Sequence, residues 1–308
     1  MTTLLVTHQA CFGHDPGRQH PESPARLKAI LVALEAPEFV ALERRAAPLA
    51  QVEQLARVHA RLYVDRVLQA IPSSGYAAFD PDTVVSPGSG EAALRAAGAV
   101  VAAVDAVMAG EVRNAFCAVR PPGHHAEAAR AMGFCLFNNV AVGAEQARKV
   151  HGLARVAVVD FDVHHGNGTQ HMFERDADLF YASTHQWPFY PGTGAADETG
   201  VGNIVNVPLA PMSGSPEFRA AMGDIVLPAL RRFRPDLLLI SAGFDAHADD
   251  PLASLRLVEA DYEWVTRELM AVADECCRGR VISTLEGGYD LHALAASAAA
   301  HVRTLMGA

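Results

Sequence analysis

The sequence predicts one α/β domain built around a mostly parallel sheet, and three observations along its 308 residues support this class. Short apolar runs alternate with longer alanine-rich stretches of helical character, as in α/β proteins. Several runs are almost continuously apolar, which is typical of parallel strands covered on both faces. No linker rich in proline, glycine or serine divides the chain, so we expect residues 1–308 to form one domain.

The expected elements alternate along most of the chain. The strands are predicted at 3–8, 114–120, 155–164, 179–185, 204–209, 236–243 and 280–288. The helices are predicted at 23–35, 51–71, 89–109, 138–150, 216–233, 259–278 and 290–306. Ser23–Pro24 and Ser215–Pro216 each combine an N-cap residue with a first-turn proline, which indicates where two of these helices begin.

Composition and charge exclude several classes of protein. Apolar residues make up 50% of the chain and charged residues 19%, as in soluble globular proteins. The net charge of −10 argues against a nucleic-acid partner, and no apolar stretch reaches the roughly 18 residues of a membrane span. The N-terminus lacks the regions of a signal peptide, and the five cysteines show no CxxC spacing. We therefore expect a cytoplasmic protein with reduced thiols and no membrane partner.

Polar residues gather directly after the apolar runs. His8 and the segments RPPGHH, DFDVHH, STH, GFDAH and EGGY each directly follow an apolar run. The carboxyl ends of parallel strands lie along one edge of a sheet, where ligands bind. The sequence therefore predicts a functional site at this edge.

A metal site is predicted from the segment DFDVHH. Alternate side chains of an extended backbone share one face, so Asp162 and His164 can converge on one cation. Asp245, after another predicted strand, is the best placed third ligand. Two carboxylates and one imidazole leave an open coordination position, which is typical of a catalytic Zn²⁺ site.

The segment RPPGHHA supplies candidates for general acid–base catalysis. His124 and His125 are adjacent on a backbone stiffened by two prolines, which suits proton transfer from a metal-bound water. We expect Asp160 behind His124 and Asn167 behind His125, each fixing the tautomer of its ring. Tyr289, after the two glycines of LEGGYD, is a candidate hydrogen-bond donor to a developing oxyanion.

These motifs in this order resemble the histone deacetylase superfamily of zinc amidohydrolases, and most closely its class II-like branch with bacterial and acetylpolyamine amidohydrolases. The matching segments span nearly the whole chain and are HPESPARL, RPPGHHA, GFCLFNN, VDFDVHHGNGTQ, STH with FYPGTG, AGFDAHADDPLA and LEGGYD. The resemblance implies the three-layer arginase/deacetylase fold with an eight-stranded sheet. It also implies direct amide hydrolysis with one Zn²⁺ per chain and a structural K⁺.

The resemblance assigns roles to single positions. The positions that match zinc ligands are Asp162, His164 and Asp245. His125 matches the general base, His124 its electrostatic or acid partner, and Tyr289 the tyrosine that polarises the amide carbonyl. Asp160 matches the carboxylate behind His124, and Arg26 resembles an internal arginine near the product exit path. The positions that match the K⁺ site, mainly through backbone carbonyls, are Asp160, Asp162, His164, Ser183 and Thr184.

The substrate is narrowed by the resemblance to two classes. The positions that match the channel wall around an acyl-lysine stem are Gly133, Phe134 and Tyr190, the last of which is often Phe in the family. Leu252 stands where one polyamine-selective branch has Glu, which favours acyl-lysine. Asp80 and Asp82 at the predicted rim suit the backbone amides of a peptide, but equally an acetylated polyamine.

Two other classes of function stay open. One is a catalytically silent acyl-lysine binding module that retains only the fold. The sequence argues against it, because Tyr289 and all three residues that match zinc ligands are present. An arginase-like dimanganese hydrolase would need a second metal set, for which DAHAD at 245–249 has suitable spacing. The turn expected at Asp250–Pro251 instead favours a loop there. The sequence leaves the oligomeric state open, a homo-oligomer included.

Overall fold

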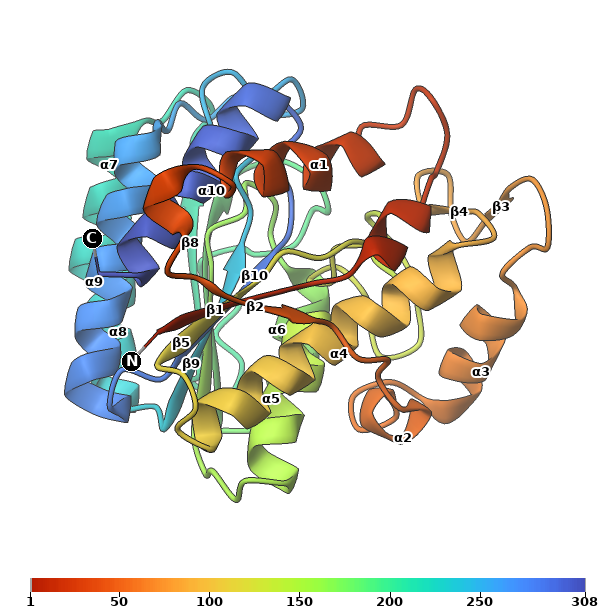
Figure 1. Cartoon of the computed structure of the whole chain (residues 1–308). Coiled ribbons are helices and arrows are strands. Elements are labelled where there is room, and N and C mark those ends of the chain that lie inside the picture. The colour runs from red at the N-terminus through yellow and green to blue at the C-terminus, as the bar shows by residue number, and fades with distance from the viewer. Residues whose placement is uncertain (1, 308) are drawn as a thin grey trace.

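The computed structural model describes residues 2–307 and contains an eight-stranded sheet between two layers of helices (Figure 1). The strand order is β2-β1-β5-β10-β9-β6-β7-β8, and every neighbouring pair is parallel. The predicted α/β class and the eight-stranded sheet implied by the resemblance are therefore confirmed. Parallel order brings all carboxyl ends of the strands to one edge of the sheet.

The strands of the sheet are β1 (Thr3–Thr7), β2 (Glu43–Ala46), β5 (Asn114–Cys117), β6 (Val156–Asp160), β7 (Leu179–Gln186), β8 (Ile204–Leu209), β9 (Leu237–Ala242) and β10 (Val281–Leu285). Every residue of β5, β6, β7, β9 and β10 is buried, because helices cover both faces there. A separate antiparallel hairpin is formed by β3 (Ala77–Ala78) and β4 (Val84–Val85).

The helices form two layers on opposite faces of the sheet (Figure 1). One layer consists of α1 (Pro24–Ala33), α7 (Ser215–Ala220), α8 (Leu227–Phe233), α9 (Glu259–Cys277) and α10 (Leu291–Leu305). The other consists of α2 (Val52–Leu55), α3 (Arg61–Gln69), α4 (Ser89–Met108), α5 (Asn139–Lys149) and α6 (Asn167–Phe173). α6 begins at Asn167, two residues after the DFDVHH segment, where the sequence predicts no helix.

The edge strand β2 was also missed by the sequence prediction. Its residues, ERRA, alternate between half-buried and exposed, so no apolar run marks them. Charged side chains are common on edge strands because they discourage pairing with another chain. Strand prediction from apolar runs therefore finds the covered strands and passes over this one.

Two predicted helices differ from the structure in continuity. The stretch 51–71 is divided into α2 and α3, because His59 between them is buried and its Nε2 accepts the backbone N–H of Asn138 at 2.9 Å. The stretch 216–233 stays helical, but a π-helical segment, Ala221–Val226, separates α7 from α8. Propensity alone does not reveal such tertiary contacts.

The strand that carries the predicted metal motif ends earlier than expected. β6 stops at Asp160, so the prediction that Asp162 and His164 lie on an extended strand was wrong. The backbone N–H of Asp162 donates to Asp160 Oδ1 at 3.1 Å, and that of His164 donates to Asp162 Oδ1 at 2.9 Å. These side-chain contacts fold residues 161–166 into a loop beyond the sheet edge.

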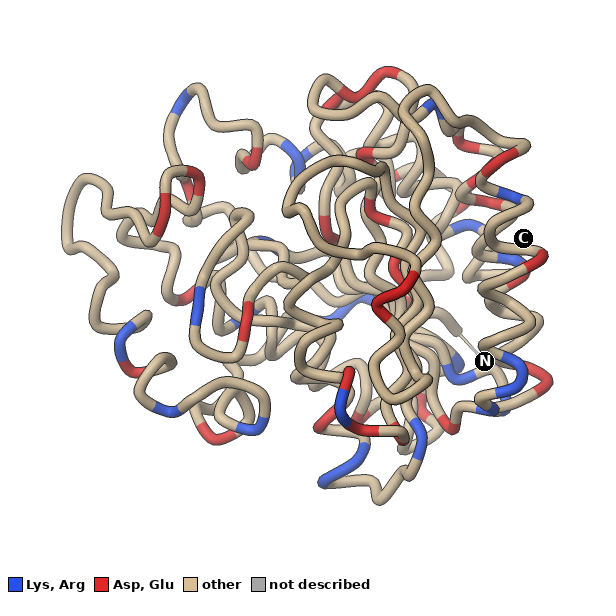
Figure 2. The backbone as a smooth tube through the Cα atoms, turned by 180° about the vertical axis from the view of Figure 1, so that it is seen from behind, with Lys and Arg blue, Asp and Glu red and all other residues tan. Residues whose placement is uncertain are grey.

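The distribution of charge, the hydropathy of the helices and the state of the cysteines can be compared with what the composition predicts. Figure 2 shows Lys and Arg distributed along the chain among Asp and Glu rather than gathered in one tract. Within residues 2–307, no helix combines the length and the apolar character needed to cross a membrane. All five cysteines are free, and four of them are buried.

Candidate active site

A pocket of about 250 Å³ lies beyond the carboxyl ends of the strands. Its floor contains the predicted residues His124, His125, His164 and Tyr289. Its walls contain the predicted residues Asp82, Gly133, Phe134, Tyr190 and Leu252. The structure therefore brings together side chains from segments that are far apart in the sequence: the β3–β4 hairpin and the segments that follow β5, β6, β7, β9 and β10.

Asp162, His164 and Asp245 form a compact triad beside this floor. One ligand atom from each lies within 4.8 Å of the other two. His164 Nδ1 is 3.0 Å from Asp162 Oδ1 and 3.2 Å from Asp245 Oδ2. Both aspartates are fully buried, and Asp245 Oδ2 accepts no hydrogen bond from the described part of the chain. A buried carboxylate oxygen without a donor is costly unless a cation binds it.

Backbone amides hold the remaining carboxylate oxygens of the triad. Asp162 Oδ2 accepts the N–H of Gly287 at 2.8 Å, and Asp245 Oδ1 accepts the N–H of Val163 at 2.9 Å. A Cβ atom at position 287 would lie 2.0 Å from Asp245 Oδ2 and 2.7 Å from Asp162 Oδ2. Only glycine therefore allows the backbone after β10 to approach both carboxylates.

The two carboxylates of the triad favour the protonated form of His164. Burial by itself would lower the pKa of His164, but the carboxylates of Asp162 and Asp245 outweigh it and raise that pKa to about 10. The metal-free ring is therefore cationic at neutral pH. A metal ion that binds Nδ1 must displace this proton.

His124 and His125 differ in charge at neutral pH, one cationic and one neutral, although their ring centres are only 4.0 Å apart. His124 Nδ1 is 2.9 Å from Asp160 Oδ2; burial opposes the charge, but Asp160 and Asp162 raise the pKa of His124 to about 10. His125 Nδ1 is 2.8 Å from Asn167 Oδ1. Burial and the neighbouring charge of His124 hold the pKa of His125 well below its usual range.

The partners of the two rings also set their tautomers. Asn167 Oδ1 can only accept, so His125 carries its proton on Nδ1 and presents the lone pair of Nε2. Asp160 accepts from His124 and, at 3.1 Å, from the hydroxyl of Tyr181. The structure therefore pairs a neutral, proton-accepting ring with a charged, proton-donating one.

Tyr289 stands on the pocket floor as a protonated phenol. Burial raises its pKa well above the usual range, so its O–H remains a donor. Its backbone N–H donates to Asp250 Oδ2 at 2.7 Å, and the guanidinium of Arg26 lies 4.8 Å from its ring centre. Arg26 is fully buried, pairs with Glu22 at 3.0 Å and donates to the backbone carbonyl of Gly288.

Aromatic rings form the walls of the pocket. Gly133 and Phe134 both adopt a positive φ, +56° and +67°. A Cβ at Gly133 would lie 2.4 Å from Cδ2 of His125, so this glycine packs directly on the histidine ring. The Tyr190 ring lies 5.1 Å from that of His125, and Leu252 closes the wall.

Several predicted polar residues lie elsewhere. Asp80 does not line the pocket, because its Oδ1 accepts the backbone N–H groups of Asp82 and Thr83 in a local turn. His8 caps a short helix by accepting the N–H of Ala10, and His185 lies within β7, as the predicted strand at 179–185 has it. Only some of the polar side chains that follow the apolar runs therefore belong to the pocket.

The DAHAD segment forms a loop rather than a second metal set. His247 is buried, whereas Asp249 is exposed. Within residues 2–307, the triad is the one group of three or more His, Cys, Asp or Glu side chains close enough to share an ion. The loop expected from Asp250–Pro251 agrees with this placement.

Glu286 and Asp250 were not assigned a role from the sequence. Burial raises the pKa of both carboxyls to about 7, and both accept backbone N–H groups from segments that line the pocket. The signal for Glu286 was present, since an acidic residue directly follows the apolar run RVISTL. A buried carboxyl at the end of a strand needs partners, which sequence alone does not identify.

Comparison with known proteins agrees with this geometry. A family model described as "Histone deacetylase domain" matches residues 20–305. The chain is 43% identical to the histone deacetylase-like amidohydrolase of Pseudomonas aeruginosa, over 92% of this chain and 74% of that protein. It is 40% identical to the chloroplastic histone deacetylase 14 of Arabidopsis thaliana, over 99% and 77% of the two chains.

The fold is also similar to a solved structure. The crystal structure of the HDA15 HD domain superposes with a TM-score of 0.95 at 38% sequence identity. The match covers 99% of this chain and 88% of the other. A probable deacetylase of Archaeoglobus fulgidus is 38% identical over 94% of this chain.

Proposed function

The chain belongs to the histone deacetylase family of amide hydrolases, and on that premise we propose that it is a zinc-dependent deacetylase acting on acyl-lysine. The reaction is hydrolysis of the amide at the lysine side-chain amine. The observation that carries this proposal is the buried triad of Asp162, His164 and Asp245 beside one cationic and one neutral histidine, His124 and His125. A silent binding module would not need this difference between His124 and His125.

The triad fits a metal ion by its own chemistry. Asp245 Oδ2 is buried, makes no hydrogen bond of good geometry within residues 2–307, and has the ring nitrogen Nδ1 of His164 3.2 Å away as its ion-pair partner, a place that a metal ion would take over. One nitrogen and two carboxylate donors, with His164 on the pocket floor, suit a catalytic zinc site with an open position. A bound Zn²⁺ would lower the pKa of a coordinated water and polarise the substrate carbonyl.

The two histidines divide the proton transfers. His125 is the general base, because its Nε2 carries a lone pair and its lowered pKa keeps the ring neutral. His124 is cationic, held by Asp160, and stabilises negative charge on the reacting amide. A histidine proton then reaches the leaving amine, and acetate departs.

Tyr289 donates its O–H to the oxyanion that forms as water adds to the amide carbonyl. Its raised pKa keeps the proton on the phenol at neutral pH. Gly287 and Gly288 bring this residue close to the triad. Such preorganised donors supply a large part of the rate enhancement in acyl transfer.

The walls suit a narrow, unbranched substrate stem. Phe134 and Tyr190 present rings to the pocket, and Leu252 adds apolar surface where a carboxylate would attract a cation. Asp82 is half-buried at the pocket and suits the backbone amides of a peptide substrate. The same carboxylate also suits a second candidate substrate, an acetylated polyamine, because a negative charge at the wall attracts the ammonium groups of a polyamine.

A structural K⁺ and a reducing compartment complete the proposal. The K⁺ would be held mainly by backbone carbonyls of Asp160, Asp162, His164, Ser183 and Thr184. Asp160 and Ser183 are paired across β6 and β7, and the buried hydroxyl of Thr184 finds no hydrogen-bond partner among residues 2–307. Residues 1–308 would act as one catalytic domain, and the free cysteines favour a cytoplasmic setting.

The test compares acetyl-lysine peptides with acetylated polyamines, using protein reconstituted with zinc. We expect about one Zn per chain, higher kcat/KM on the peptides, and a kcat for Tyr289→Phe lower by roughly 10²–10³-fold. Gly223→Ala, at a helical position with open space around it, is the control variant. Two bound Mn per chain, or near-normal deacetylation by Tyr289→Phe, would contradict the proposal.

A further inference from the structure

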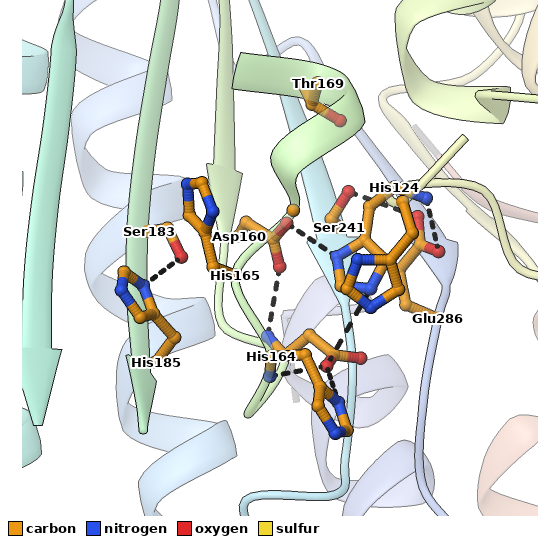
Figure 3. A network of polar contacts seen from close by, with 12 residues as sticks. His124, Asp160, His164, His165, Thr169, Ser183, His185, Ser241 and Glu286 are labelled. Atoms are coloured by element: carbon orange, nitrogen blue, oxygen red, sulfur yellow. Dashed lines mark hydrogen bonds and ion pairs between the residues drawn. The ribbon is translucent and has the colours of Figure 1, made fainter. Parts of the chain in front are cut away.

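Glu286 is a buried carboxyl that the proposed reaction does not use. It directly follows β10 and is fully buried. Its Oε2 accepts the backbone N–H of Gly123 at 2.7 Å and that of His124 at 3.1 Å, and its Oε1 accepts the hydroxyl of Ser241 at 3.2 Å. Figure 3 shows this carboxyl beside His124, on the side of the histidine away from Asp160.

The surroundings of Glu286 are unusual for a stabilising carboxylate. Within residues 2–307, no Lys or Arg side chain forms an ion pair with it. Burial raises its pKa to about 7, which means that keeping the group ionised is unfavourable. A polar group held in the interior at such a cost is expected to satisfy backbone groups that have no other partner.

The contacts of Glu286 join two parts of the site. On one side, its carboxyl fixes the backbone at Gly123 and His124, the segment that carries both histidines. On the other side, Gly287 donates to Asp162, and Tyr289 follows two residues later. The guanidinium of Arg26 donates to the backbone carbonyls of Glu286 and Gly288, which holds this second segment in place.

His124 is thereby held at two points. Its ring is fixed by Asp160 and its backbone by Glu286. The other side of this segment is tightly packed as well, since a Cβ at Gly123 would lie 2.5 Å from the backbone nitrogen of Asn139. Without the Glu286 acceptor, two buried N–H groups would lose their partner and the histidine segment would shift to find another.

We propose that Glu286 is a positioning residue that sets the tandem histidines relative to the segment carrying Tyr289 through its hydrogen bonds to the Gly123 and His124 amides. This inference rests on the proposed deacetylase function, because it assigns Glu286 a task in that site. The side chain acts through the backbone of His124 and does not touch the substrate. A displacement of about 1 Å at reacting groups is enough to lower the rate about 10²-fold.

Two substitutions separate hydrogen bonding from charge. Glu286→Gln keeps the shape and an oxygen that accepts both amides, whereas Glu286→Ala removes every acceptor. We expect Glu286→Gln to retain kcat within about fivefold of the wild type, and Glu286→Ala to lose about 10²-fold in kcat with KM within about threefold. Glu145→Ala, which truncates a buried glutamate of α5 that does not line the pocket, should leave kcat within about twofold.

Thermal unfolding and zinc content are measured for every variant, and amide chemical shifts of Gly123 and His124 report the hydrogen bonds independently of activity. If Glu286→Ala does not fold, Glu286→Asp, whose shorter side chain retracts the carboxylate, takes its place. The inference is overturned if zinc-loaded Glu286→Ala, or its Asp replacement, keeps wild-type kcat, or if Glu286→Gln loses as much as the truncated variant. A wild type that hydrolyses neither acyl-lysine nor acetylpolyamine would instead refute the proposed function. Unchanged Gly123 and His124 amide shifts in Glu286→Ala would refute the positioning role alone.

Discussion

Replacing Gly287 by alanine should disable the metal site while the fold persists. The new Cβ would lie 2.0 Å from Asp245 Oδ2, whereas ordinary contacts begin at 3.4 Å, so the carboxylate or the backbone must retreat by more than 1 Å. A displacement of that size costs about 10²-fold in rate. Disturbed supporting contacts around metal ligands typically weaken metal binding about 10–100-fold. We expect Gly287→Ala to show both losses.

The assay is zinc titration with a competing chelator, followed by kcat/KM at saturating zinc. Gly223→Ala makes the same chemical change in the helical segment between α7 and α8, where nothing lies within 4 Å of the added Cβ. It should match the wild type in both measurements. Wild-type zinc affinity together with kcat/KM within threefold of normal in Gly287→Ala would refute the steric reasoning.

Three further predictions concern charge. Asp160→Asn removes the anion that raises the pKa of His124 to about 10, so His124 should lose its proton at a lower pH than in the wild type. The decline of kcat at high pH should then begin at a lower pH, and an unchanged decline would contradict this. The pKa of metal-free His164 is raised to about 10, and zinc must displace its proton. Below that pH, zinc affinity should therefore increase about tenfold for each unit by which the pH is raised, and calorimetry should detect about one proton released per ion. Asp82→Asn should lower kcat/KM for acetylated polyamines more than for peptides, because an amide oxygen still accepts hydrogen bonds but carries no charge; equal losses would argue against charge recognition.

The sequence predicted every strand of the sheet except the edge strand β2. Continuous apolar runs mark strands with both faces buried, and β5, β6, β7, β9 and β10 are of this kind. β2 escaped because the pattern ERRA reflects an exposed edge. Strand order is not encoded in local patterns either, and the convergence of Asp245 with Asp162 depends on the adjacency of β9 and β6.

Within the site, residue types were easier to predict than their geometry. Asp162 and His164 were singled out by their spacing, but they meet Asp245 because aspartate side chains fold the loop after β6, not because a strand aligns them. Glu286 contacts backbone amides of a segment 162 and 163 residues away in the chain. No spacing rule predicts a partner at that distance, since the two segments meet only through the sheet.

The pocket walls come from four connections, two of which carry no residue of the floor or the triad. Asp82 lies in the β3–β4 hairpin, Phe134 between β5 and α5, Tyr190 between β7 and β8, and Leu252 between β9 and α9. None of these side chains supplies a ligand atom to the triad. The β3–β4 hairpin and the β7–β8 connection can therefore change in length or in side chains without altering a connection that carries the triad, His124, His125 or Tyr289, whereas the walls of Phe134 and Leu252 cannot be rebuilt so independently.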